Sequence, residues 1–208
     1  MFVLTIDQRN SQCSGDNVPQ LLDGLADLPA VLAFERSVGD EIQGVFSSAE
    51  TVTDAVLRIL RWGGWYVGIG VGPVEEPLPA SPREAGGPAF VAARRAVDRA
   101  KKTGDRPAVA VEGSPGAAEA EAVLVLLGRL VADRTDAEWR ILQHVQPGKW
   151  GAQTAAARKL DISSQAVSNA VLRAGWQEEW AARPAAAVLL RRADEMAEAA
   201  RTKTKGEG

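Results

Sequence analysis

The chain has 208 residues and a formal net charge of −3, from 24 Lys and Arg against 27 Asp and Glu. This length allows one large domain or two modest ones with a buried core, and the composition excludes a collagen-like or wholly disordered chain. A single Cys13 and a single His144 exclude an internal disulfide framework and a Cys-based zinc site. No apolar run is as long as a membrane-spanning helix of ~18–20 residues, and residues 1–7 lack a basic signal-peptide region, so we expect a cytoplasmic protein that makes no membrane contact.

The first two thirds of the chain alternate strand patterns with helix patterns, and prolines mark a loop at 72–87. In chain order we expect a strand at 2–6, a helix at 17–28, strands at 30–35 and 42–46, a helix at 49–62, a strand at 65–71, a helix at 88–102, a strand at 108–111 and a helix at 117–134. Gly39 and Asp40 between two strands predict a hairpin. The first six elements have the order βαββαβ of a ferredoxin-like palm, an antiparallel sheet backed by helices. Alternating glycines at 68, 70 and 72 in one strand indicate close backbone packing.

The last third is helical throughout. We expect helices at 136–145, 154–160, 164–174 and 184–202, with Ser163 as an N-cap, Gly175 ending the third helix and Pro184 starting the fourth. The predicted fold is therefore α+β, a ferredoxin-like or cyclase-like palm with additions at 1–133 and a small all-α helix-turn-helix domain at 134–208. The last helix is amphipathic over 185–200 and could close a homodimer. Four of the six Trp lie in this third, and we expect them to form its core.

The charge is divided unevenly between these two parts. Residues 135–208 carry 11 Lys and Arg against 9 Asp and Glu, a net charge of +2, which leaves −5 for residues 1–134. An acidic front and a mildly basic back are compatible with a nucleic-acid contact at the back.

Residues 153–173 have the spacing of a DNA-binding helix-turn-helix. Ala156 is small where two helices must cross, Ile162 is an apolar residue for the turn, and Val167, Val171 and Leu172 direct the second helix into a core. Gln and Asn pair with adenine, Arg pairs with guanine, and basic side chains reach phosphates. The predicted DNA-facing residues are Arg158, Lys159, Ser163, Ser164, Gln165, Ser168, Asn169 and Arg173. The alternative is a helical hairpin used for dimer packing.

Carboxylates occur at the ends of neighbouring strands in the predicted palm. Asp7 follows the first strand, and Asp40 and Glu41 lie in the hairpin between the next two. In a βαββαβ sheet these segments lie side by side, so their carboxylates could hold Mg²⁺ or Mn²⁺ that bridges a nucleoside triphosphate. The structural alternative is that Asp7 forms an Asx turn and Asp40 is a turn residue beside Gly39.

These motifs resemble known families. The strand ending in Asp7, the hairpin at 39–41, the strand at 67–72 and Gly86 followed by 92–94 resemble, in that order, class III nucleotidyl cyclases over about the first 110 residues. The segments 5–7, 34–44 and 87–96 together with the C-terminal helix-turn-helix resemble the SatD family over nearly the whole chain. The SatD resemblance implies a bacterial cytoplasmic protein and leaves its biochemical role open.

The cyclase resemblance implies roles for individual residues. Asp7 and Asp40 match the two metal-binding aspartates, and Arg94 falls where cyclases keep a phosphate-stabilising arginine. Phe90 occupies the position of the asparagine that cyclases keep four residues earlier, so the catalytic set is incomplete. The leading hypothesis is a DNA-binding transcriptional regulator whose palm dimerises and senses a nucleotide. The alternative is a metal-dependent nucleotidyl cyclase or nucleotidyltransferase with Asp7, Asp40 and Arg94 as the catalytic candidates.

Overall fold

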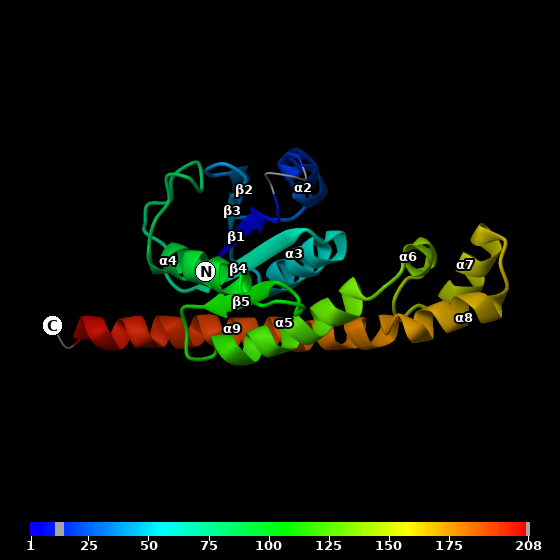
Figure 1. Cartoon of the computed structure of the whole chain (residues 1–208). Helices are drawn as coiled ribbons and strands as arrows, with labels where there is room; N and C mark the ends of the chain where they lie inside the picture. The colour runs from blue at the N-terminus through cyan, green and yellow to red at the C-terminus, as the bar shows by residue number, and fades with distance from the viewer. Residues whose placement is uncertain (11–14, 207–208) are drawn as a thin grey trace.

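A five-stranded mixed sheet forms the centre of the N-terminal part in a computed structural model of the chain, which describes residues 1–10 and 15–206 (Figure 1). Cys13 lies outside these described residues. The strands are β1 (Phe2–Gln8), β2 (Leu32–Arg36), β3 (Ile42–Phe46), β4 (Trp65–Val71) and β5 (Val109–Glu112), in the sheet order β2-β3-β1-β4-β5. β1 is antiparallel to both β3 and β4, β2 is antiparallel to β3, and β5 is parallel to β4. The expected hairpin between β2 and β3 is present.

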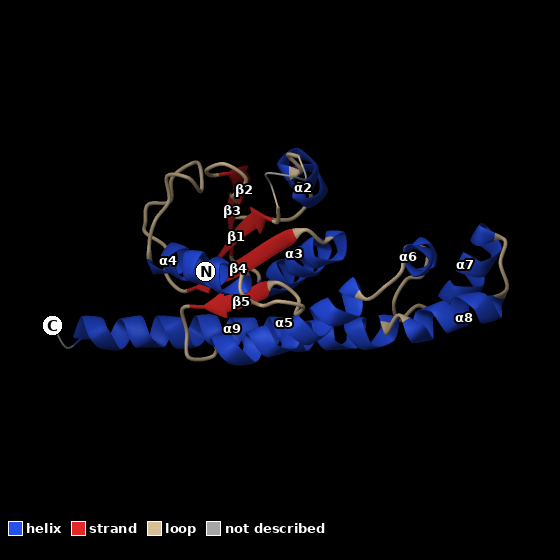
Figure 2. Cartoon of the chain, in the orientation of Figure 1, coloured by secondary structure: helices blue, strands red, loops and turns tan. Residues whose placement is uncertain are grey.

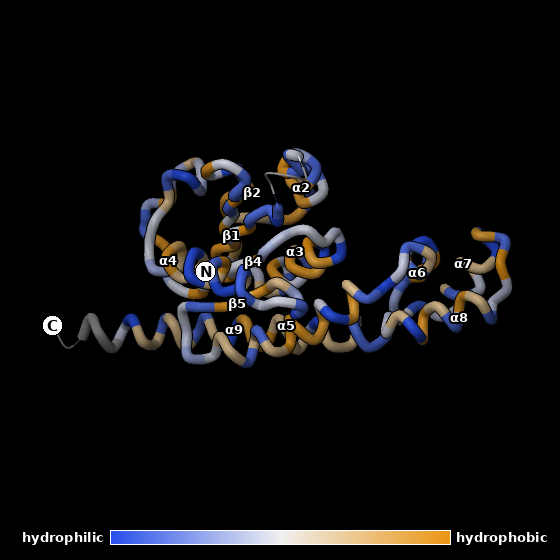
Figure 3. Tube along the Cα trace, viewed as in Figure 1, coloured by the Kyte–Doolittle hydropathy of each residue, from blue (hydrophilic) through white to orange (hydrophobic). Residues whose placement is uncertain are grey.

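Helices cover both faces of this sheet. The described helices are α2 (Val18–Leu25), α3 (Ala49–Trp62), α4 (Pro88–Ala100), α5 (Ala117–Ala132), α6 (Asp136–Leu142), α7 (Ala152–Leu160), α8 (Ser164–Arg173) and α9 (Trp176–Gly206). Those that pack against the sheet are α2, α3, α4, α5 and α9. Residues of β1 alternate between the faces, because successive side chains of a strand point to opposite sides. Leu4 and Ile6 belong to the main core with α2, α3, α5 and α9, whereas Val3 packs with α4. Hydrophobic residues are accordingly concentrated around β1, α3 and α5 (Figure 3).

The approach of α4 to β4 explains the alternating glycines. A Cβ atom at Gly68 would overlap the backbone of Val97 and Ala93, and one at Gly70 would overlap the backbone of Ala89 and Ala93. The facing side of α4 is built from buried alanines at 89, 92, 93 and 96. The close packing predicted for this strand is therefore confirmed for Gly68 and Gly70.

The last third of the chain contains three short helices that lie away from the sheet (Figure 2). We call α6, α7 and α8 the three-helix unit and the sheet with α2–α5 the sheet body. The core of the unit consists of Leu142, Val145, Ala152, Ala156, Ala157, Val167, Val171, Ala174 and Trp176. α6 begins with a capping box, in which Thr135 and Glu138 each bond the other's backbone N–H. The α+β class is thus confirmed. In the part of the chain that the structure describes, the regular elements after residue 113 are all helices.

α9 differs from the predicted last helix. It begins at Trp176, contains Pro184 in its interior and spans 31 residues, so Pro184 does not start a helix. It runs from the three-helix unit along the sheet body, where Ala186, Leu190 and Ala193 are buried against α3 and α5 (Figure 1). Burial of this face outweighs the hydrogen bond that the proline cannot donate. Much of the apolar face that we expected to close a dimer is thus covered within the chain, while Val188 stays 53% exposed.

Two expectations about tryptophans are wrong. Trp176 is in the core of the three-helix unit and Trp139 packs against it, but Trp150 is 98% exposed and Trp180 is 37% exposed. Trp150 lies in the connection between α6 and α7, beyond the reach of the small core. None of the helices that the structure describes has the length and apolarity needed to cross a membrane.

Candidate nucleic-acid interface

α7, a three-residue turn and α8 form the candidate helix-turn-helix. Asp161 adopts a left-handed conformation with φ of 53°, which ends α7. The Ile162 N–H then donates to the Ala157 carbonyl (3.1 Å), and Ser163 Oγ accepts a hydrogen bond from the Ala166 N–H (3.1 Å). Ala156 and Val167 are buried between the two helices, as their positions in the sequence predicted. The chain therefore turns tightly and starts α8 at a fixed angle to α7.

All eight predicted DNA-facing residues lie on the surface. The exposed set comprises Arg158, Lys159, Ser163, Ser164, Gln165, Ser168, Asn169 and Arg173. Gln165 Nε2 donates a hydrogen bond to Asn169 Oδ1 (3.0 Å), which joins two of them one helical turn apart. Arg173 Nε lies 3.7 Å from Glu138 Oε1 of α6, although most of the arginine side chain is exposed.

One apolar residue of this motif lies elsewhere than expected. Leu172 is 73% exposed and is not a core residue, whereas Ile162, which is 37% exposed, lies in the turn as expected. Successive residues of a helix are about 100° apart, and Val167 and Val171 already occupy the inward face of α8. Leu172 is therefore turned to the face that carries Gln165, Ser168 and Asn169.

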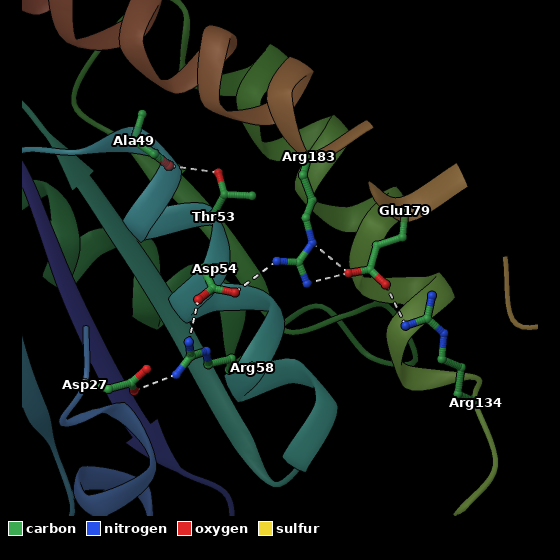
Figure 4. Close-up of polar contacts among 8 residues, drawn as sticks. All are labelled: Asp27, Ala49, Thr53, Asp54, Arg58, Arg134, Glu179 and Arg183. Atoms are coloured by element: carbon green, nitrogen blue, oxygen red, sulfur yellow. Dashed lines mark hydrogen bonds and ion pairs between the residues drawn. The ribbon is translucent and has the colours of Figure 1, made fainter. Parts of the chain in front are cut away.

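A buried arginine holds the C-terminal end of α8. Arg134 Nε donates to the Ala174 carbonyl (2.9 Å), and Arg134 Nη1 forms an ion pair with Glu179 Oε2 of α9 (2.6 Å) (Figure 4). Their side chains are 1% and 0% exposed. A cation at the last carbonyls of a helix also interacts favourably with the helix dipole. Sequence reasoning missed this pair, because Arg134 and Glu179 come from elements separated by the whole three-helix unit.

Further ion pairs extend from Glu179 into the sheet body. Arg183 bonds Glu179 one turn earlier on α9 and also Asp54 of α3 (2.9 Å). Asp54 in turn pairs with Arg58 (2.8 Å), and Arg58 pairs with Asp27 beyond α2 (2.6 Å) (Figure 4). The i, i+4 spacings of Glu179 with Arg183 and of Asp54 with Arg58 were the signs of this network in the sequence. This network of ion pairs therefore connects α3 with the end of α8.

Aromatic rings add a second contact between the two parts. The guanidinium of Arg61, in the last turn of α3, lies 3.9 Å from the ring centre of Trp139 on α6. Trp139 meets Trp176 edge to face, with ring centres 6.3 Å apart. A cation over an indole face is an attractive arrangement. Burial and the nearby charge of Arg134 lower the pKa of Arg61.

The predicted carboxylate site is a cluster of ion pairs between β1, the start of β3 and α4. Asp7 Oδ2 pairs with Lys101 Nζ (2.6 Å), and Glu41 pairs with Arg94. Glu41 is buried, and this burial raises the pKa of its carboxyl, while Arg94 lowers it and Asp7 raises it further. Asp7, Glu41 and Arg94 are thus brought together, and Asp40 is half-buried in the preceding turn.

The donors of this cluster are of the type that Mg²⁺ prefers, but each carboxylate faces a cation. A divalent ion would need Lys101 to leave Asp7 and Arg94 to leave Glu41. Among the residues that the structure describes, three or more His, Cys, Asp or Glu side chains nowhere converge closely enough to hold a metal ion. In this arrangement the residues form an ion-pair network, which a metal ion would have to displace.

No protein-family model matches the sequence, and neither a curated protein nor a solved structure is significantly similar to it. The functional argument therefore depends on the residues and their geometry.

Proposed function

We propose that this protein is a DNA-binding transcriptional regulator that reads duplex DNA with α7 and α8. The observation that carries the proposal is the common exposure of the eight DNA-facing residues on a tightly turned pair of helices. Helix-turn-helix proteins place the second helix in the major groove, where its side chains reach base edges. The resemblance to the SatD family stays a prediction from the segments quoted above.

The charge of the interface sets what kind of binding we expect. α7 and α8 contain Arg158, Lys159 and Arg173 and lack Asp and Glu, so the surface is basic, although weakly. Phosphate contacts usually supply much of the affinity for DNA. A homodimer that doubles these contacts is therefore part of the proposal, with the sheet body as the dimerising part and as a nucleotide sensor. The βαββαβ order of the elements from β1 to β4 supports a palm-like sheet body, as does the antiparallel pairing of these four strands.

Selection from a random duplex library, followed by mobility-shift titration at low salt, tests the proposal. The full chain should enrich one motif, and Asn169→Ala should weaken binding to that motif by about tenfold, the effect of one lost base contact. Gln20→Ala, on the exposed side of α2, is a matched control and should bind as the parent chain does. Failure to enrich any motif with an intact dimer would reject the DNA-binding proposal.

The proximity of Asp7, Glu41 and Arg94 favours a second candidate function, metal-dependent nucleotidyl transfer. Each nucleoside triphosphate would be incubated with Mg²⁺ or Mn²⁺ and the substrate followed by chromatography. Turnover that Asp7→Ala and Asp40→Ala abolish would establish the enzyme. Stable triphosphates in every incubation would leave the cluster with a structural or binding role.

A further inference from the structure

Four residues form one exposed line along α8, which we call the α8 stripe: Gln165, Ser168, Asn169 and Leu172. Their spacing is i, i+3, i+4 and i+7, so they share one face of the helix. This is the set of positions by which a helix in the major groove reaches base edges. The opposite face carries Val167 and Val171 and is buried in the three-helix unit.

Leu172 is the unusual member of the α8 stripe. A leucine of the core would be covered, but this side chain is 73% exposed beside amide and hydroxyl side chains. Among the base edges of the major groove, the C5 methyl group of thymine is the apolar feature that an apolar side chain contacts. The chemistry of Leu172 therefore matches thymine and gives no hydrogen bond to guanine or cytosine.

The amides of the stripe complement the partner base of thymine. The bond from Gln165 Nε2 to Asn169 Oδ1 leaves Asn169 Nδ2 as a donor and Gln165 Oε1 as an acceptor. Adenine presents N7 as an acceptor and N6 as a donor in the major groove. The joined amides thus offer one donor and one acceptor to the two groups of adenine.

The distance along α8 fits a short site. Leu172 is seven positions after Gln165, which at a rise of 1.5 Å per residue is about 10 Å along the helix axis. Base pairs follow one another every 3.4 Å, so about 10 Å corresponds to about three steps. The amide pair and Leu172 can therefore address neighbouring base pairs within one groove.

We propose that Leu172 is a specificity-determining residue that contacts thymine methyl groups, so that α8 selects a half-site rich in A·T pairs. This inference rests on the proposed DNA-binding function and adds to it the class of sequence that is bound. The α8 stripe itself lacks a charged side chain, which is consistent with recognition of thymine methyl groups and of adenine N6 and N7. Arg158 and Lys159 lie outside the stripe, on α7.

The experiment uses duplexes in which thymine is replaced by uracil, which removes the methyl group and keeps every hydrogen-bonding group of the base. The motif selected by the full chain is synthesised with each thymine in turn changed to uracil, and binding is titrated for the parent chain and for Leu172→Ala. For the parent chain, at least one replacement should weaken binding by about fourfold, the value of one buried methyl group. For Leu172→Ala, the same replacement should change binding by less than twofold.

Leu126→Ala is the matched control, because Leu126 of α5 is 68% exposed and lies outside α7 and α8. It should keep the full response to uracil. A motif without A·T pairs, a parent chain indifferent to uracil, or a Leu172→Ala variant that keeps the fourfold response would each overturn the inference and leave DNA binding intact. Loss of the dimer in Leu172→Ala, seen by sedimentation, would assign Leu172 to a contact between copies and also overturn it. A parent chain that enriches no motif would overturn the proposed function itself, and the inference with it.

Discussion

At the scale of single residues, the burial of the charged groups indicates how each ion pair affects the free energy of unfolding. Glu41 is buried beside Arg94, whose side chain is 54% exposed, so the carboxylate is desolvated more completely than its partner. Burial penalises the charged form, which is why the pKa of Glu41 is raised despite the arginine. The charged carboxylate at neutral pH therefore costs the folded state free energy.

Glu41→Gln should raise the free energy of unfolding at pH 7 by about 1 kcal/mol or less. The folded protein holds the Glu41 proton more tightly than the unfolded chain, so the cost of the parent carboxylate appears as pH rises above its ordinary pKa and through the raised one. Urea titrations at pH 7 and at pH 4 measure this. The gain should vanish at the lower pH, and a stability difference independent of pH would contradict the assignment.

Arg134→Met should lower the free energy of unfolding by about 3 kcal/mol, because it removes one partner of a buried ion pair and the donor to the Ala174 carbonyl. Arg191→Met is the control. Arg191 pairs with Glu50 at the surface, where both side chains are more than half exposed, and its loss should cost about 0.5 kcal/mol or less. Both values come from chemical denaturation, and equal losses would show that the buried pair is no stronger than the surface pair.

At the scale of elements, the contact between β4 and α4 depends on backbone proximity. A side chain at position 70 meets backbone atoms of α4, which cannot move without shifting the helix. Because the overlapping atoms belong to the main chain, rotamer changes cannot relieve the overlap.

Gly70→Ala should therefore destabilise the protein by about 3 kcal/mol. Gly86→Ala is the matched change, because its Cβ would meet the end of the flexible Glu75 side chain at 2.9 Å, which can rotate away. Thermal unfolding of both variants compares them directly. A midpoint for Gly70→Ala close to that of Gly86→Ala would show that α4 is not fixed against the sheet.

At the scale of the whole molecule, an acidic chain presents a basic interface. Residues 1–134, which include the sheet body, carry a net charge of −5 and repel DNA, whereas the basic residues of α7 and α8 attract it. Binding should therefore weaken steeply with salt, in proportion to the number of phosphates contacted.

Lys159→Ala should reduce the slope of log affinity against log salt by about 1, because one phosphate contact is lost. Lys102→Ala, on the surface beyond α4, should leave this slope unchanged. Titration of the selected duplex at several salt concentrations measures both. An unchanged slope for Lys159→Ala would place that side chain away from the phosphates.

Local patterns in the sequence predicted most of the elements and less of their contacts. The apolar patterns predicted the strands, Gly39 and Asp40 predicted the hairpin, and Ser163 predicted the start of α8, because these features depend on neighbours in the chain. Pairs between distant segments, such as Arg134 with Glu179 or Asp7 with Lys101, carry no local signal. The orientation of Leu172 depended on which of two adjacent apolar residues the core would accept, and Pro184 was misplaced because packing outweighed its helix-breaking tendency.

The position of α9 also has a consequence for synthesis. This helix supplies Ala186, Leu190 and Ala193 to the core of the sheet body, although it is made after the three-helix unit. While a ribosome is still translating residues beyond 185, the first strands have emerged but their hydrophobic face lacks this cover. The last residue of the core of the three-helix unit is Trp176, which is made before the α9 residues that cover the sheet body. The N-terminal part of the nascent chain is therefore completed last, and a stalled chain ending before α9 would expose apolar surface that invites aggregation.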